Sequence, residues 1–128
     1  MLKTGLKGEA SVEVMRGNTA IEVGSGSVPV FATPMLVALM ENAAINALLG
    51  ALPEGQTTVG TKVDVAHTAA TPIGQTVTAR AQLVETDGRR LVFQVAAEDD
   101  NGPVGSGTHE RFVVDLEKFL AKVKEKSS

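Results

Sequence analysis

The sequence predicts an α+β fold in which an antiparallel sheet wraps around one long central helix. A single long apolar helical segment begins near Thr33-Pro34, one strand-like stretch precedes it, and four strand-like stretches follow it. One strand, one buried helix and an antiparallel meander form an α+β order. With 128 residues, 43% of them hydrophobic, the chain has the size and core of one domain spanning residues 1–128.

The segment before the helix predicts one strand and one loop. Glu9–Met15 alternates weakly, with valines between polar residues, and Gly17-Asn18 ends it. Val23–Val28 reads VGSGSV, and this small, glycine-rich composition favours a flexible loop. The loop lacks the GxxxxGK[ST] pattern, so a phosphate-binding loop is not expected there.

The central helix is predicted to start at Thr33-Pro34 and to end at Gly50. Threonine is a good N-cap, and proline is favoured at the first helical position, where its missing N–H costs nothing. The helix surface is apolar nearly all round and is interrupted only by Glu41, Asn42 and Asn46. Such a helix must be covered on most of its sides.

Four strands are predicted after the helix, separated by turn sequences. They are Thr57–Ala69, Gln75–Glu85, Leu91–Ala97 and Val104–Val114. Alternation places one set of side chains of each strand on the same face. In the first strand these are Val59, Thr61, Val63, Val65 and His67; in the second, Val77, Ala79, Ala81 and Leu83; in the third, Leu91, Phe93, Val95 and Ala97. A curved sheet wrapped around one helix is the hotdog fold, which we therefore expect.

The tail from 115 to about 126 reads DLEKFLAKVKEK and predicts a further helix. Its apolar residues have helical spacing, and its outer face is basic. We expect the lysines Lys118, Lys122, Lys124 and Lys126 to form a solvated face; contact with the phosphates of a bound ligand is the alternative.

Composition excludes several classes of function. The net charge is −3 and aromatic residues make up 3%, so neither the cation clusters nor the stacking platforms of nucleic-acid binding are present. No apolar run is long enough to span a membrane. The absence of cysteine excludes disulfides and thiolate sites, two histidines make a tight metal site improbable, and no cofactor is expected. The composition and the absence of a signal-peptide pattern in residues 1–8 favour the cytoplasm.

Glu41 and His67 are the candidates for acid–base chemistry. A carboxylate on an apolar helix is costly unless it is paired or lies in a wet cleft, and the alternative for Glu41 is an exposed helix edge or a subunit contact. A histidine on an apolar face is more often a satisfied core residue. If the sheet wraps the helix, however, the face carrying His67 points at the helix carrying Glu41, and the two side chains would converge.

Three further residues have weaker signals. Thr33 is expected at the helix start, where free N–H groups suit an oxyanion. Gly60 marks a bulge or a close backbone approach, and can present an N–H to a bound carbonyl. For His109, on the face opposite Thr108 and Glu110, a surface or interface role is favoured, and Ser106 lacks the setting of a nucleophile elbow.

At this point the residues show a resemblance. Four segments, which cover most of Val30–Lys124, are similar to sequences of the fluoroacetyl-CoA thioesterase family of hotdog proteins. They read VFATPMLVALMENAA, VGTKVDVAHTAATPIGQTVTARAQL, EDDNGPVGSGTHER and DLEKFLAKV. The resemblance implies a homodimer, or a higher oligomer, that hydrolyses a short acyl-CoA thioester. The family's catalytic threonine, glutamate and histidine fall on Thr33, Glu41 and His67.

The resemblance also implies a substrate-binding set. The family's glycine, whose backbone meets the thioester oxygen, falls on Gly60, and Phe31 and Pro34 flank the catalytic threonine. Before Val30 the resemblance is poor, because a phenylalanine-bearing lid of the family is replaced by GSGSVPVF, with Phe31 as its only aromatic. A general short acyl group is therefore a better expectation than fluoroacetyl selectivity.

Two other functions remain as alternatives. A hotdog hydratase pairs an aspartate with a histidine five residues on, whereas Asp64 precedes His67 by three. A non-catalytic acyl-CoA binder would keep Glu41 and His67 for polar contacts. Association of two copies is expected in any case, because one small sheet leaves an edge strand and part of the apolar helix uncovered.

Overall fold

The computed structural model describes residues 2–127. In chain order the elements are β1 (Lys7–Glu13), η1 (Arg16–Asn18), α1 (Ala20–Val23), α2 (Thr33–Ala47), β2 (Gln56–His67), β3 (Thr76–Asp87), β4 (Arg90–Asp99), β5 (Gly102–Asp115), α3 (Leu116–Lys124) and η2 (Glu125–Ser127).

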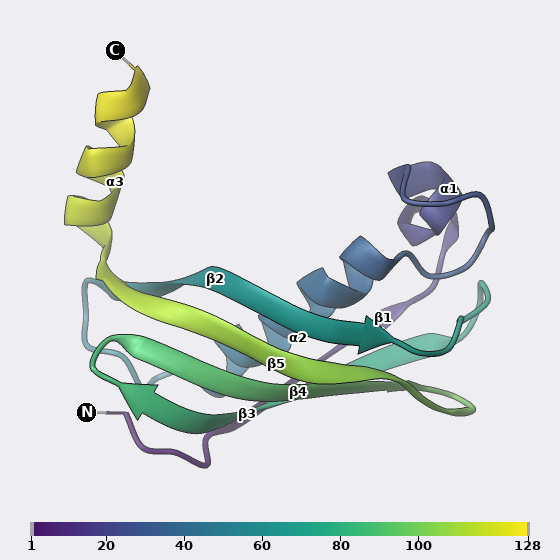
Figure 1. The fold of residues 1–128 in the computed structure, drawn as a ribbon, viewed down its shortest axis with the longest axis horizontal. Coiled ribbons are helices and arrows are strands. Elements are labelled where there is room, and N and C mark those ends of the chain that lie inside the picture. Colours follow the sequence, from purple (N-terminus) through teal and green to yellow (C-terminus); the bar gives the residue numbers. More distant parts are fainter. Residues whose placement is uncertain (1, 128) are drawn as a thin grey trace.

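The five strands form one antiparallel sheet in the order β1-β3-β4-β5-β2. The sheet curves, and α2 lies along one of its faces (Figure 1). This arrangement confirms the predicted α+β class with one helix against a wrapped sheet. β1 and β2 are the two edge strands, so one side of the β2 backbone has no neighbouring strand in the sheet.

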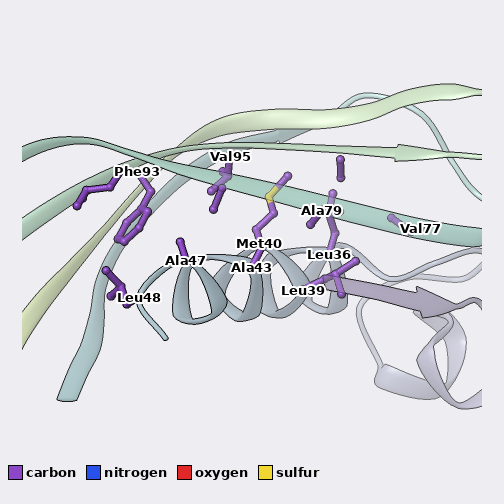
Figure 2. Packing of buried hydrophobic residues seen from close by; sticks show 14 of the residues in the cluster. Leu36, Leu39, Met40, Ala43, Ala47, Leu48, Val77, Ala79, Phe93 and Val95 are labelled. Carbon is purple, nitrogen blue, oxygen red and sulfur yellow. The ribbon is translucent and has the colours of Figure 1, made fainter. Parts of the chain in front are cut away.

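The core lies between α2 and the concave face of the sheet (Figure 2). All eight residues predicted to point inward from β3 and β4 are at most 5% exposed. The helix contributes Leu36, Leu39, Met40, Ala43, Ala44 and Ala47 to the same core. The alternation of period two therefore located the buried face of both strands correctly.

The helix and β1 approach each other closely at Gly8. A Cβ at this position would lie 2.2 Å from the backbone nitrogen of Ala47 and 2.4 Å from the carbonyl oxygen of Ala43. Both are backbone atoms, so no side-chain rotation could relieve the overlap. Glycine at position 8 thus fixes how near α2 can sit to the edge of the sheet.

The boundaries of α2 differ from the prediction at both ends. The N-cap is Ala32, so Thr33 is the first helical residue and its hydroxyl makes no capping bond. The last helical residue is Ala47, and Gly50 follows with a φ of 76° in a turn. The N-cap prediction was wrong by one residue, because an extended Ala32 supplies the cap conformation and releases the Thr33 side chain.

The predicted loop is present over 24–28, with Val23 in a short helix, and the prediction for β2 is corrected. The Val23–Val28 loop is preceded by the one-turn helix α1, which ends at Gly24 in the left-handed region. Such a short turn has no periodicity to detect. In β2 the register shifts between Gly60 and Lys62, so the extra residue breaks the predicted single face. Val63, Val65 and His67 keep one face, whereas Val59 pairs with the exposed Phe112 on the other.

The predicted tail helix is present as α3, but it projects away from the sheet (Figure 1). None of its residues is buried. No helix within residues 2–127 is both long and apolar enough to cross a lipid bilayer.

Replacing Gly8 by alanine is expected to lower the free energy of unfolding by about 2–3 kcal/mol, because the new methyl group would overlap the α2 backbone. Chemical denaturation monitored by circular dichroism measures the change. Gly17→Ala is the matched control, since a Cβ there meets nothing within 4 Å. Equal stability of the two variants would show that α2 can move away from β1 at little cost.

Candidate active site

Thr33 and His67 are joined by a direct hydrogen bond. The Thr33 Oγ1 lies 2.7 Å from His67 Nδ1. Thr33 is brought there by the first turn of α2, and His67 by the last residue of β2. The freed hydroxyl, which does not cap the helix, is therefore used to hold the imidazole.

The surroundings of His67 favour its neutral form. Burial lowers its pKa below the ordinary value, and the backbone of Ala69 opposes that shift. Its Nε2 is buried and has no hydrogen-bond partner among the described residues. An unpaired buried nitrogen is uncommon in folded proteins, which makes this atom a candidate contact for a ligand or another chain.

A cavity of about 320 Å³ opens beside this pair. Its lining includes Val28, Val30, Phe31 and the predicted residues Thr33 and His67. Phe31 is 1% exposed and belongs mainly to the core, although it borders the cavity. Pro34 is an exposed residue of the first helical turn and is not among the lining residues.

Glu41 lies in a second cluster, on the inner face of the sheet. Its Oε2 is 3.4 Å from Nη1 of Arg111, and its side chain is 37% exposed. Arg111 is 5% exposed and also donates to the hydroxyl and the carbonyl oxygen of Thr58. Burial lowers the pKa of Arg111, and the charge of Glu41 opposes that shift. The buried cation thus holds one end of a carboxylate that remains reachable from solvent.

Gly60 lies directly beneath this carboxylate. A Cβ at Gly60 would be 2.5 Å from Glu41 Oε2, so only glycine leaves the carboxylate its place. For Gly60 the sequence predicted a bulge or a close approach to its backbone, and both are present. The group that approaches Gly60 is the Glu41 side chain. The bulge puts Gly60 on the same face as Arg111, its partner in β5.

His109 supports the cluster from below, and the expectation of a surface or interface role for it was wrong. It is 1% exposed. Its Nδ1 donates to the Lys62 carbonyl oxygen at 2.8 Å, which leaves Nε2 to accept from Arg111 at 3.1 Å. Burial is the main cause that lowers its pKa, and the neutral form fits both bonds.

Arg111 was missed by the sequence reasoning. The signal was present, because the inner-face alternation of β5 continues from His109 through Arg111 to the buried Val113. A charged residue inside such a pattern predicts a buried partner of opposite charge.

The structure does not bring all three predicted catalytic residues together within one chain. Thr33 and Glu41 are eight residues apart on α2, which corresponds to about 12 Å along the helix. Thr33 and His67 form one cluster, and Glu41 and Gly60 form the other. No group of three or more histidine, cysteine or acidic side chains within residues 2–127 is arranged to bind a metal ion.

A larger hollow of about 750 Å³ lies on the outer face of the sheet. It is bordered by residues such as Arg80, Gln94 and Ser106, and by none of the predicted site residues. Arg80 is already engaged by Glu9 and Glu98. The predicted reactive residues therefore lie on the inner face and at the β2 edge, away from this hollow.

Comparisons with known proteins fit this geometry. Residues 14–117 match the family described as fluoroacetyl-CoA-specific thioesterase. A fluoroacetyl-CoA thioesterase from Streptantibioticus cattleyicolor is 51% identical over 98 residues, which cover 77% of this chain and 70% of the relative. The family match begins at residue 14, earlier than the resemblance from Val30 that was noted in the sequence.

Solved structures extend the similarity to nearly the whole chain. A fluoroacetyl-CoA thioesterase superposes with a TM-score of 0.91 at 40% identity, covering 98% of both chains. A thioesterase superfamily member from Thermus thermophilus has a TM-score of 0.90 at 27% identity, over 98% of this chain and 93% of that one. A hot-dog-like protein from Thermanaerovibrio acidaminovorans has a TM-score of 0.88 at 27% identity, with the same coverage. The predicted hotdog fold and thioesterase class are confirmed, and the chain belongs to the family of fluoroacetyl-CoA-specific thioesterases.

Proposed function

We propose that the protein hydrolyses a small acyl-CoA thioester to the free acid and coenzyme A. Family membership supports this reaction. The observation that carries it is the half-exposed Glu41 carboxylate, held by Arg111 directly above the backbone of Gly60. A carboxylate fixed at a glycine that can admit a substrate carbonyl is suited to acyl transfer.

In the proposed mechanism, backbone N–H groups near Gly60 or the start of α2 polarise the thioester carbonyl and stabilise its oxyanion. Glu41 acts as the nucleophile, or as the general base on a water molecule. His67 transfers protons to and from water or the leaving thiolate. Thr33 holds the His67 ring through its hydrogen bond and so orients it towards the substrate.

A small acyl group is favoured by what lies behind Glu41. His109 and Phe93 fill the core there, with ring centroids 6.3 Å apart, and both are at most 1% exposed. A long acyl chain would have to displace them. Selectivity for a fluoroacetyl group is not part of the proposal, because Gly24, Ser25, Gly26 and Ser27 provide no aromatic lid over the cavity.

The proposal requires a homodimer, since one chain separates Glu41 from His67. β2 is an edge strand, and Val63 on its inner face is 38% exposed. The outer side of α2, with Ile45 43% exposed, is also uncovered, as is Leu49 in the turn after the helix, which is 74% exposed. Antiparallel pairing of two β2 strands would complete the ladder and cover both.

The middle of β2 offers a register for this pairing. With the two-fold axis at Val63, Lys62 lies opposite Asp64 of the partner subunit, which gives attractive charge pairs. His67 of the partner subunit then falls opposite Val59, one residue from Gly60 and about 3 Å along the strand. The unpaired Nε2 of that histidine would then lie near Glu41, and each active site would use both subunits.

The cytoplasm is the proposed location, supported by the absence of cysteine from a chain of ordinary globular composition. The partner of the site is then the acyl-CoA itself, with no cofactor beyond the coenzyme A of the substrate.

The reaction is tested with a panel of acyl-CoAs assayed for thiol release. Acetyl-CoA and similarly small esters are expected to turn over, and long-chain esters to react poorly. Glu41→Ala is expected to lower kcat/KM by about 10²–10⁴. Glu54→Ala, a matched change at an exposed loop residue, should leave the rate near that of the wild type. Binding without turnover by the wild type would favour a non-catalytic binder instead.

The shared site is tested by mixing two inactive variants, Glu41→Ala and His67→Ala. A mixed dimer contains one intact site, so random reassociation is expected to restore about a quarter of the wild-type rate. Refolding the two together and measuring thiol release gives the result. If the mixture stays as inactive as either variant alone, the two residues act within one chain.

The pH dependence follows from the lowered pKa of His67. Because its neutral form accepts the proton, kcat/KM should be level above about pH 6.5, the ordinary histidine value, and should fall below it as the ring is protonated. In His67→Gln the residual rate should lose this acid limb. Circular dichroism over the same range controls for unfolding, since the unfolded chain binds protons more readily than both buried histidines. An unchanged limb in the variant would assign it to another group.

A further inference from the structure

Two apolar projections stand at opposite ends of the β2 edge. One is α3, and the other is the α1 segment, defined here as residues 15–30. Eight of the thirteen large hydrophobic side chains that are exposed within residues 2–127 belong to these projections or adjoin them: Met15, Ile21, Val23, Val28, Ile73, Leu116, Leu120 and Val123. A small protein rarely exposes such groups together unless they meet a partner.

The α3 projection is amphipathic. Leu116, Leu120 and Val123 are 43%, 55% and 48% exposed and, with Phe119, form a stripe at helical spacing. Lys118, Lys122 and Lys124 occupy the remaining surface together with Glu117 and Ala121. The helix starts directly after Asp115, which pairs with Gln56, the first residue of β2. Its stripe therefore begins at the start of the edge strand, and no packing within residues 2–127 buries it.

The α1 segment stands at the other end of the same strand. It is tied there by the bridges Thr19–Phe31 and Val30–Pro72. Together with Thr33 and His67, residues Ala20 and Val28 line the cavity described above. The exposed Val28 thus borders the half of the active site that contains the histidine, and the exposed Ile21 and Val23 belong to the same segment.

The two projections cannot meet within one chain. β2 has twelve residues, so its ends are about 36 Å apart. Figure 1 shows α3 and α1 both rising past β2, one at each end of the strand. Antiparallel pairing with a second copy reverses the strand, and so places α3 of one subunit beside the α1 segment of the other.

We infer that α3 of each subunit docks its apolar stripe on the α1 segment of the partner subunit and forms a wall of that subunit's cavity at Thr33 and His67. The occupant of the α3 face is therefore a second copy of this chain. The inference rests on the proposed dimer and extends it, because each active site then receives Glu41 and a covering helix from the same neighbouring subunit. The lysines of α3 are left on the outside, near the mouth of the cavity.

The absence of native cysteine makes a disulfide test direct. The double variants Leu120→Cys/Val28→Cys and Leu120→Cys/Ile21→Cys are oxidised mildly and run on non-reducing gels. At least one is expected to give a covalent dimer that reverts on reduction. Leu120→Cys alone and Leu120→Cys/Val84→Cys are the controls, because Val84 is 42% exposed on β3, away from both projections.

Kinetics test whether the docked helix borders the substrate. Leu120→Asp should raise KM for acetyl-CoA by about tenfold, because a charge on the stripe opposes docking of the wall. Ala121→Asp adds the same charge on the opposite face of α3 and should change KM by less than about twofold. Circular dichroism of both variants confirms that the fold is kept.

The outcomes separate the two proposals. If the wild type is a dimer that hydrolyses acetyl-CoA but neither cysteine pair cross-links beyond the controls, the docking is wrong and the function stands. If a pair cross-links in a protein that releases no thiol from any acyl-CoA, the proposed function fails and the docking stands. Equal KM changes in Leu120→Asp and Ala121→Asp would also contradict the wall.

Discussion

The structure depends on how closely α2 can lie against the curved sheet. The helix is apolar nearly all round, yet one five-stranded sheet covers only one side of it. Small residues set the distance, with Gly8 passing over the backbone between Ala43 and Ala47. Any side chain at position 8 would lift the helix and open the core that Phe93 and Met40 fill. The same close seating brings the Glu41 carboxylate down onto β2.

The chemistry of Glu41 follows from that seating. Gly60, at the β-bulge, has no side chain to occupy the carboxylate's position. Arg111 compensates the charge from β5, and His109 fixes Arg111 while holding the Lys62 carbonyl within the bulge. Buried polar groups are tolerated here because a continuous series of hydrogen bonds joins the Lys62 carbonyl through His109 and Arg111 to Glu41. A rigid, partly exposed carboxylate results.

The surface around the β2 edge, in contrast, contains polar and apolar groups that lack partners within residues 2–127. The β2 edge, the outer side of α2, α3 and the α1 segment leave unpaired backbone or apolar side chains exposed. His67 adds a buried nitrogen without a partner. These features have one common explanation in a two-fold pairing across β2, which would join two half-sites. In the proposed dimer, the reactive groups of each subunit lie at the surface that pairing would cover.

The sequence by itself determined the class of fold, the buried face of β3 and β4, and the individual residues of interest, because period-two alternation and one long apolar helix are local patterns. It also marked Gly60 as special. Only the tertiary structure decided which groups meet. The one-residue bulge in β2 reverses faces, so pattern reading could not pair Gly60 with Arg111. The shift of the N-cap to Ala32 gave the Thr33 hydroxyl to His67, and the length of α2 set that pair apart from Glu41. Contacts between distant segments depend on exact register and distance, which composition and spacing do not contain.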